Sequence, residues 1–218
     1  MKIDMHVHST YSGDSNGKPE EIIKKAEKVG LDGLAFMDHN TLEGYRSIKD
    51  IETDLIIVPG IEVSTGEGHV MAIGIQEEIG KTPSIAGAID LIEEQGAIAA
   101  APHPYRYWSG MTEENLFNNR WTAIEGLNGR SWHSKNVKAR KAAEKMSLPM
   151  IAGSDCHRLK TVGKAYAIFE ELDSWEDVVK NIKDGNVDVA GKDRTYVQTF
   201  FYVRRALSGY VRRGFKRI

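Results

Sequence analysis

The sequence has a single cysteine, Cys156, among its 218 residues. An internal disulfide needs two cysteines and a thiolate zinc cage needs several, so both kinds of scaffold are excluded. Long apolar runs are also missing, since none approaches the roughly 20 residues that a membrane-spanning helix needs. The first residues, Met-Lys-Ile-Asp, lack the charged and apolar regions of a signal peptide. We therefore expect a cytoplasmic protein without a transmembrane segment.

A large net charge is absent from the chain as a whole. The formal net charge is −2, which excludes a globally basic nucleic-acid binder. This average conceals an asymmetry, because residues 194–218 contain no acid and seven basic residues: Arg194, Arg204, Arg205, Arg212, Arg213, Lys216 and Arg217. Without those seven charges, the first 193 residues have a net charge of −9. We predict a folded body over residues 1–193 and a basic helical tail over residues 194–218.

The tail combines these charges with apolar residues at near-helical spacing, from Tyr196 to Phe215. A basic amphipathic helix has three candidate roles: docking on the body, binding an anionic membrane or nucleic-acid surface, and self-association. Docking is the ordinary role of a C-terminal helix with this many apolar residues. A contact with nucleic acid would use the arginines of the tail, namely Arg204, Arg205, Arg212 and Arg213.

The body has the composition of an ordinary globular core, with 41% hydrophobic and 28% charged residues. Short apolar runs predict strands at residues 2–7, 33–37, 55–58, 70–75, 97–101, 122–127, 150–152 and 165–169. Start and stop signals predict helices over residues 19–30, 83–96, 134–146 and 174–183. Alternation of this kind predicts one α/β domain, a parallel sheet covered by helices that is either open or closed into a barrel.

Histidines gather where these strands end. His6 and His8 end the first strand, and His39, His103 and His157 follow later ones, whereas His69 lies at the start of its run. Acids accompany them at Asp14, Asp38, Glu62 and Asp155. Because the carboxyl ends of parallel strands meet at one edge of the sheet, residues 150 positions apart can share one site.

These residue types suit bound divalent metal ions. In His6-Val7-His8 the period of a strand places both imidazoles on one face, and Asp155-Cys156-His157 repeats the arrangement. Histidine with carboxylate favours Zn, Mn or Fe, and the number of donors could hold two or three ions with a bridging carboxylate. Clustered metals of this kind hydrolyse phosphate esters. Any one of these residues alone would equally fit a turn, a loop or a solvated face, so the prediction depends on their joint placement.

The same residues form motifs that resemble those of a known family. Asp4-Met5-His6-Val7-His8-Ser9-Thr10 with Asp14, Asp38-His39-Asn40, Gly60-Ile61-Glu62-Val63-Ser64 with Gly68-His69-Val70, Ala101-Pro102-His103-Pro104 and Gly153-Ser154-Asp155-Cys156-His157 resemble the motifs of the PHP (polymerase and histidinol phosphatase) family. The resemblance runs in order over residues 1–169 and is specific only when the motifs are taken together.

The resemblance implies a distorted β/α barrel of seven strands with a trinuclear metal centre and phosphoesterase activity. It would assign His6, His8, Glu62 and Asp155 to one ion. Glu62 would bridge to a second ion held with His69 and His103, and Asp14, His39 and His157 would hold the third. Cys156 departs from the family, which usually has a small residue such as alanine there. We expect its side chain to pack away from the metals, with a thiolate ligand as the alternative.

The expected nucleophile is a metal-bridging water, because divalent metals lower the pKa of bound water toward about 7. We expect Asp38 to orient an imidazole rather than to bind metal. Arg106, Arg130 and Arg158 are candidates to bind substrate phosphate, since guanidinium groups grip phosphate through two hydrogen bonds. His133 is a candidate substrate contact or general acid. Each of these four would equally fit a solvated loop.

The predicted function is therefore metal-dependent hydrolysis of a phosphomonoester, a nucleotide or a similar small phosphate. Only 51 residues separate His103 from Asp155, which predicts an open site without a covering subdomain. Alternatives are a histidinol-phosphate phosphatase, a nuclease acting on nucleic-acid ends, and a non-catalytic metal-binding adaptor that works through the basic tail.

Overall fold

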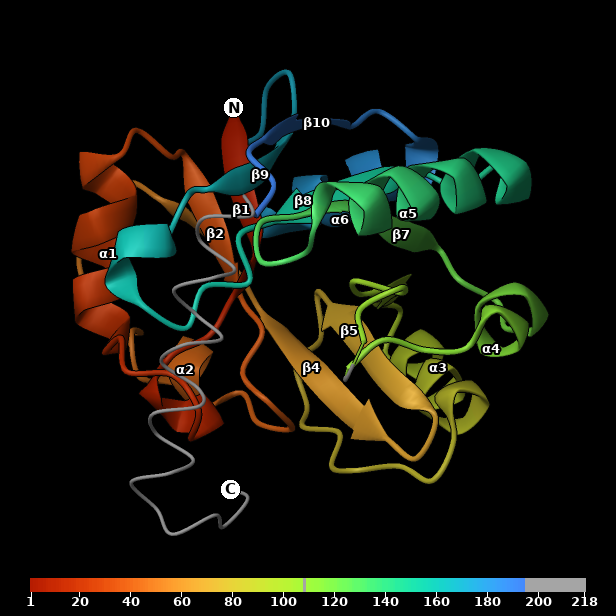
Figure 1. Cartoon of the computed structure of the whole chain (residues 1–218). Helices are drawn as coiled ribbons and strands as arrows, with labels where there is room; N and C mark the ends of the chain where they lie inside the picture. The colour runs from red at the N-terminus through yellow and green to blue at the C-terminus, as the bar shows by residue number, and fades with distance from the viewer. Residues whose placement is uncertain (108, 195–218) are drawn as a thin grey trace, which may run out of the picture.

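The computed structural model describes residues 1–107 and 109–194 (Figure 1). The predicted tail helix and its arginines, Arg204, Arg205, Arg212 and Arg213, lie outside the described residues. Within the described part of the chain, no helix is long and apolar enough to cross a membrane.

In the described residues, ten strands form one sheet that curls into a nearly closed barrel. They are β1 (Lys2–Val7), β2 (Gly33–Phe36), β3 (Ile56–Val58), β4 (Gly60–Thr65), β5 (Gly68–Ile73), β6 (Ile98–Ala101), β7 (Ala123–Asn128), β8 (Met150–Gly153), β9 (Ala165–Ile168) and β10 (Asp188–Gly191). Their order is β3-β2-β1-β9-β8-β7-β6-β5-β4, and β10 pairs with β9. A bridge between His39, just past β2, and Glu62 joins β4, at one end of this order, to the chain that follows β2, the neighbour of β3 at the other end.

The barrel narrows to seven strands at the carboxyl ends of β1 and β8. There β9 no longer separates these two strands, because Val7 bridges Cys156 and the Asp155 amide donates to the His6 carbonyl over 2.7 Å. With the His39–Glu62 bridge, the ring at this end consists of β1, β2, β4, β5, β6, β7 and β8. The predicted distorted barrel of seven strands is confirmed.

The sheet is mixed rather than parallel throughout, which corrects the expectation of a parallel barrel. Strands β1–β2, β2–β3, β6–β7 and β7–β8 pair in parallel, whereas β5 is antiparallel to β4 and β6, and β9 is antiparallel to β1, β8 and β10. The reason is connection length, since two residues join β4 to β5 and a parallel crossover needs about a dozen or more. Strands β4 and β10 were not among the predicted runs.

The helices lie outside the sheet (Figure 1). They are α1 (Pro19–Lys28), α2 (Glu43–Arg46), α3 (Ile85–Glu94), α4 (Glu113–Asn118), α5 (His133–Met146) and α6 (Trp175–Asp184), with short 3-10 turns at Thr10–Ser12 and Leu159–Thr161. Helices α1, α3, α5 and α6 confirm the four predicted segments. Ser84 caps α3 by accepting from the Gly87 amide, and Ser174 with Asp177 forms a capping box on α6.

Two irregularities in the strands turn polar side chains toward the seven-stranded end of the barrel. In β1, Ile3 and Met5 belong to the apolar cluster that includes Met71 and Ile98, but Val7 packs in a different cluster with Ile22 of α1. The pairing register shifts between Asp4 and Val7, so the side chains after the shift point to the opposite face of the sheet from the one that the earlier alternation would give. A similar shift separates Glu125 from Leu127 in β7. As a result, His6, His8 and Glu125 face the site.

Candidate metal centre

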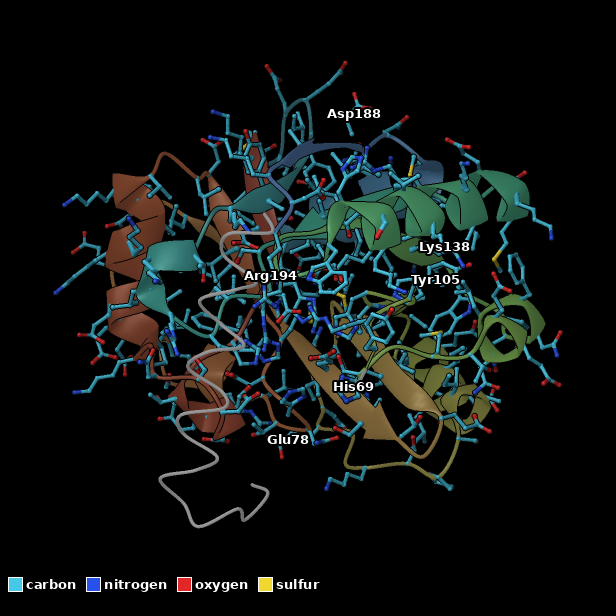
Figure 2. The ribbon with its side chains drawn as sticks, viewed as in Figure 1. His69, Glu78, Tyr105, Lys138, Asp188 and Arg194 are labelled. Carbon is cyan, nitrogen blue, oxygen red and sulfur yellow. The ribbon has the colours of Figure 1, made fainter. Side chains whose placement is uncertain are left out.

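The nine predicted metal ligands converge at the seven-stranded end of the barrel. A pocket of about 140 Å³ there is lined by Asp14, His39, Glu62, His69, His103, Arg106, Ser109, Arg130, Asp155 and His157. His6 and His8 complete the cluster beneath it and are almost fully buried. The antiparallel direction of β5 explains why His69 lies at the beginning of its strand rather than after the end: β5 begins where its neighbours end, so its first residues lie at the same rim (Figure 2).

Four groups of side chains have donor atoms within 4.8 Å of one another. They are His8, Asp14, His39 and His157; His6, Glu62 and His103; His6, His8 and Asp155; and His39, Glu62 and His69. All nine predicted ligands occur in them, and groups that share a residue adjoin one another. The groups contain the same residues as the sets implied by the family motifs but divide them differently. His8 also lies with the Asp14 group, and Glu62 lies with His6 and His103 in one group and with His39 and His69 in another.

Glu62 occupies the centre of the cluster. Its Oε1 atom lies 2.8 Å from His69 Nδ1 and 2.9 Å from His103 Nε2. Its Oε2 atom lies 3.2 Å from His8 Nε2 and 3.4 Å from His6 Nε2. His39 Nδ1 also lies 3.5 Å from Oε2. Each carboxylate oxygen therefore faces a different set of imidazoles, which is the arrangement that a carboxylate bridging two cations needs.

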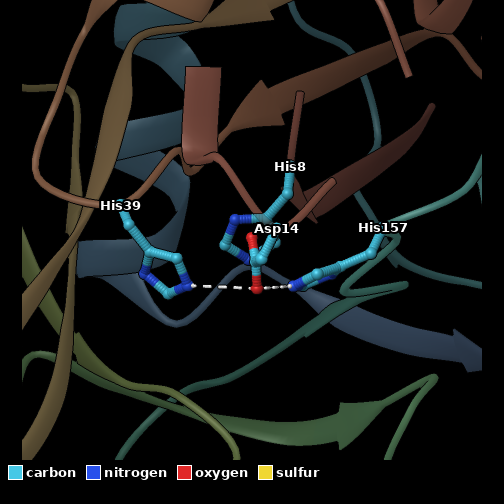
Figure 3. Close-up of side chains that lie close together, drawn as sticks. All are labelled: His8, Asp14, His39 and His157. Atoms are coloured by element: carbon cyan, nitrogen blue, oxygen red, sulfur yellow. Dashed lines mark hydrogen bonds and ion pairs between the residues drawn. The ribbon is translucent and has the colours of Figure 1, made fainter. Parts of the chain in front are cut away.

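Asp14 closes the cluster on the solvent side (Figure 3). Its Oδ2 atom lies 2.7 Å from His157 Nε2 and 3.9 Å from His39 Nε2, while the ring of His8 lies behind it (Figure 3). The Asp14 side chain is 50% exposed, compared with 2% or less for those of Glu62 and Asp155. This outermost group is accordingly the most accessible to water.

Two ligand positions adopt backbone conformations that are rare outside glycine. The φ angles of His103 and Asp155 are 28° and 49°, and both residues lie just after strands, β6 and β8. Such conformations cost of order 1–3 kcal/mol each and persist where the surroundings over-determine them. The surroundings here include the His103 amide, which donates to Glu125 over 2.7 Å, and the Asp155 amide, which donates to the His6 carbonyl.

Glu125 of β7 is a buried site residue that the sequence analysis missed. Its Oε1 atom accepts from His6 Nδ1 over 3.0 Å, and its Oε2 atom accepts from the His103 amide and from Asn128 Nδ2. With its proton on Nδ1, His6 presents the lone pair of Nε2 to the cluster. The available signal was a lone carboxylate inside the apolar strand predicted over residues 122–127.

Asp38 acts on His8 through a serine. Ser12 Oγ donates to Asp38 Oδ1 over 2.8 Å and lies 2.9 Å from His8 Nδ1, from which it can accept. Asp38 also accepts from the amide and the hydroxyl of Ser9, each over 2.6 Å. This series of hydrogen bonds places the His8 proton on Nδ1 and leaves Nε2 to face Glu62. Asp38 thus orients an imidazole through Ser12 rather than by direct contact.

Glu62 and Asp155 are held ionised, whereas the imidazoles differ from one another. Burial lowers the pKa of His8 to about 3 and that of His103 to about 4. Burial acts in the same direction on His6 and His69, but nearby carboxylates outweigh it: Glu125 holds the pKa of His6 well above its usual range, and Glu62 raises that of His69. Burial opposes ionisation of Glu62, but His6 and His69 hold its pKa well below its usual range. Burial also opposes ionisation of Asp155, whose pKa is held well below its usual range mainly by Arg106 and Arg130.

The donor set fits divalent cations. His39 Nδ1 and His103 Nδ1 are buried nitrogen atoms without a hydrogen-bond partner in the described residues, and such orphaned atoms are rare in native structures. His6 Nε2 and His8 Nε2 face each other over 3.0 Å. Neutral imidazoles and carboxylates converging without cysteine are the ligands of Zn, Mn or Fe.

Cys156 packs away from this cluster. Its side chain lies in the apolar cluster with Val7 and Ile22, and burial raises the pKa of its thiol. The alternative of a thiolate ligand therefore finds no support in the structure.

Two of the four candidate phosphate-binding residues line the pocket. Arg106 pairs with Asp155 and donates from Nη2 to Asn128 Oδ1 over 2.8 Å, and Arg130 Nη1 lies 2.9 Å from Asp155 Oδ1. Asn128 is fully buried and its Oδ1 also accepts from the Arg130 amide, so it ties both arginines together. Sequence analysis did not single out Asn128, which has no distinctive spacing.

The other two candidates lie elsewhere. The His133 side chain is 72% exposed and pairs with Asp193, a contact that turns it toward the end of β10. Arg158 precedes the 3-10 turn at Leu159–Thr161 and, like His133, is not among the described residues that line the pocket. The expected substrate contact through His133 is not supported, because α5 begins at this residue and its side chain leaves the site.

Comparison with known proteins gives several matches. A family model described as PHP-associated matches residues 133–187. Uncharacterized protein MJ1587 of Methanocaldococcus jannaschii is 34% identical over 140 residues, 59% of this chain and 82% of that protein. The phosphoribosyl 1,2-cyclic phosphate 1,2-diphosphodiesterase of Eggerthella lenta is 30% identical over 93 residues, 39% of this chain and 35% of that enzyme.

A solved structure supports the fold. A two-domain protein of Bacteroides vulgatus, containing a predicted PHP-like metal-dependent phosphoesterase, matches with a TM-score of 0.68 and 18% identity. The match covers 88% of this chain but only 64% of that one, so this chain spans less than two thirds of the larger protein.

Proposed function

Because this chain belongs to the PHP family of metal-dependent phosphoesterases, we propose that it hydrolyses the phosphomonoester of a nucleotide or of a similarly small molecule. The observation that carries the proposal is the arrangement of the pocket, which Arg106 and Arg130 line together with seven of the nine metal-ligand candidates. A metal cluster alone would suit many hydrolyses, whereas paired guanidinium groups beside it favour a phosphate.

The assignment of residues to metals is the one that the family motifs imply, and all of its members occur in the observed groups. His6, His8, Glu62 and Asp155 would hold one divalent ion, Glu62 with His69 and His103 a second, and Asp14, His39 and His157 a third. When bound, such ions lower the pKa of water and neutralise the charge of phosphate oxygens. Zn, Mn and Fe all suit this mixture of imidazole and carboxylate.

The protein's own groups prepare the site for this chemistry. Glu125 and Ser12 keep the protons of His6 and His8 on Nδ1, so both rings present Nε2 to the cluster. Arg106 and Arg130 would donate hydrogen bonds to phosphate oxygens by releasing part of their contact with Asp155. Their charges, held at the pocket wall by Asn128, would orient the phosphate toward the metals.

The shape of the site supports a small substrate. Between His103 and Asp155 the chain forms α4, β7, α5 and β8, which are ordinary parts of the barrel. The pocket of about 140 Å³ has room for a phosphoryl group rather than for a whole nucleotide, so the remainder of a substrate would lie outside it.

The test is release of inorganic phosphate by metal-stripped protein resupplied with Mn²⁺ or Zn²⁺. Substrates would be nucleoside monophosphates, nucleoside bisphosphates, histidinol phosphate and short oligonucleotides. Glu62→Gln should lower the release by more than about 100-fold, since the bridging position leaves no substitute ligand. His133→Ala is the matched control, an exposed histidine outside the pocket, and should retain wild-type activity. Equal activity of the Glu62→Gln variant, or no release from any substrate, would contradict the proposal.

A further inference from the structure

Two exposed aromatic side chains contact each other on the loops that carry Arg106 and Arg130. Tyr107 is 70% exposed and Trp132 is 37% exposed, and they are among the few large hydrophobic side chains with such exposure in the described residues. Their ring centroids lie 5.9 Å apart with an interplanar angle of 71°, an edge-to-face contact. Isolated apolar residues on a surface are ordinary, whereas an exposed aromatic pair presents a specific binding shape.

The pair and the arginines come from the same two loops. Tyr107 directly follows Arg106, and Trp132 lies two residues after Arg130. These loops follow β6 and β7 at the carboxyl end of the barrel, and Arg106, Ser109 and Arg130 of the two loops line the pocket. The two loops therefore bring the aromatic pair and the arginines to the same end of the barrel.

The charge around the pair is positive. Lys135 Nζ lies 4.3 Å from the centroid of the Tyr107 ring, a cation–π contact on the solvent side of α5. One turn further along α5, Lys138 Nζ lies 5.2 Å from the centroid of the Tyr105 ring. Both residues are labelled in Figure 2. Aromatic faces flanked by cations suit a flat, electron-rich ring that is attached to an anion.

The loop that carries Trp132 is held in place from both sides. The Arg194 amide donates to the Ser131 carbonyl over 3.0 Å, and Arg194 forms an isolated bridge with Trp132. On the other side, the Ser131 amide and hydroxyl both donate to Asn128 Oδ1. The position of the Trp132 ring is thus fixed by backbone contacts that a side-chain substitution leaves intact.

We propose that Tyr107 and Trp132 form a stacking surface for the nucleobase of a nucleoside monophosphate whose phosphate binds at Arg106 and Arg130. The proposal rests on the proposed phosphoesterase function and narrows its substrate class. A small sugar phosphate would fill the pocket without reaching the aromatic pair, so the pair distinguishes a nucleotide from other small phosphates. An apolar surface of a partner protein is a less suitable occupant of the pair, because it would match the rings but not the surrounding positive charge.

The experiment compares hydrolysis of AMP and of ribose 5-phosphate by the metal-loaded enzyme. Tyr107→Ala and Trp132→Ala should each lower kcat/KM for AMP by about tenfold, in line with the loss of one stacking contact, and leave that for ribose 5-phosphate unchanged. Tyr107→Phe and Trp132→Phe keep an aromatic ring and should restore most of the AMP activity. Leu91→Ala, which removes an exposed apolar side chain on α3, is the matched control.

Equal losses for the two substrates, or no loss for either, would overturn the stacking surface. If the wild-type enzyme hydrolyses neither compound, the proposed function fails on these substrates. The stacking surface is then tested by the affinity for AMP instead of by turnover. Calorimetric titration should then show AMP binding to the metal-loaded wild type about tenfold more tightly than to Trp132→Ala, with ribose 5-phosphate binding both alike. Equal affinity of AMP for the two proteins would reject the inference independently of turnover.

Discussion

At the scale of single residues, the site depends on side chains that bind no metal themselves. Glu125 accepts from His6 Nδ1, and Ser12 lies between His8 Nδ1 and Asp38. Both histidines end strand β1, yet their orientation comes from residues of other elements. Partners of this kind determine which nitrogen of an imidazole is left to bind, and so they affect metal affinity without touching the ion.

Replacing Glu125 tests this dependence. Glu125→Gln keeps the shape of the side chain but removes the negative charge that accepts the hydrogen bond from His6 Nδ1. We therefore expect the affinity for Mn²⁺ to fall about tenfold. Competition with a chromophoric chelator measures the dissociation constant. Glu94→Gln, an exposed glutamate at the end of α3, is the control and should bind as the wild type does. Unchanged affinity of Glu125→Gln would show that His6 is oriented by other means.

Cys156 allows a second test at this scale. Its side chain is 1% exposed, and burial raises its pKa, so the reactive thiolate form is scarce at neutral pH. The native protein should react with a thiol reagent such as DTNB far more slowly than the guanidinium-unfolded chain, which should release one equivalent of chromophore. Rapid reaction of the native protein would place the thiol in an accessible position, as a role at the metal centre would require.

At the scale of elements, the short helix α2 presses against the residues that orient His8. A methyl group added at Gly44 would lie 1.9 Å from Asp38 Oδ2 and 2.9 Å from Ser9 Oγ. Gly44 is therefore needed for the close approach of α2 to the carboxylate beneath it. The helix itself is only four residues long, so its place depends on this packing more than on helix propensity.

Gly44→Ala should consequently destabilise the protein. Alanine favours a helix over glycine by about 1 kcal/mol, but the clash displaces Asp38 from hydrogen bonds inside a packed site. We expect a net loss of about 1–3 kcal/mol in the free energy of unfolding, measured by denaturant titration. Gly80→Ala is the control, because no atom lies within 4 Å of the methyl group that it adds. Equal stability of the two variants would mean that α2 can move away from Asp38 without lowering the free energy of unfolding.

At the scale of the whole molecule, the order of motifs and apolar runs along the sequence predicted much of the architecture. The motifs placed all nine ligand candidates in the cluster, and the alternation of runs predicted the barrel and its four main helices. Pairing direction was missed at the hairpin β4–β5 because β4 was not predicted as a strand, so its two-residue connection to β5 was not seen. It was missed at β9 because the strands that β9 meets are a long-range property without a local signal. Glu125, Asn128 and the outward turn of His133 were missed for the same reason: each is decided by a partner far away in sequence.

Metal binding should be visible in the stability of the whole fold. Ions that bind only the native state at 100 times their dissociation constant add about 2.7 kcal/mol, which for a chain of this size raises Tm by about 5–10 °C. Calorimetry of metal-stripped protein with and without Mn²⁺ measures the shift, and Glu62→Gln should lose most of it. The same Tm with and without metal would argue that the cluster does not bind the ion in the native protein.

The most direct test of the account is anomalous diffraction from crystals of the Mn²⁺-loaded protein. We predict two or three strong anomalous peaks within the cluster formed by His6, His8, Asp14, His39, Glu62, His69, His103, Asp155 and His157, with Glu62 between neighbouring peaks. Peaks confined to the protein surface, or an empty cluster in crystals soaked with saturating Mn²⁺, would contradict the metal centre and the phosphoesterase mechanism that depends on it.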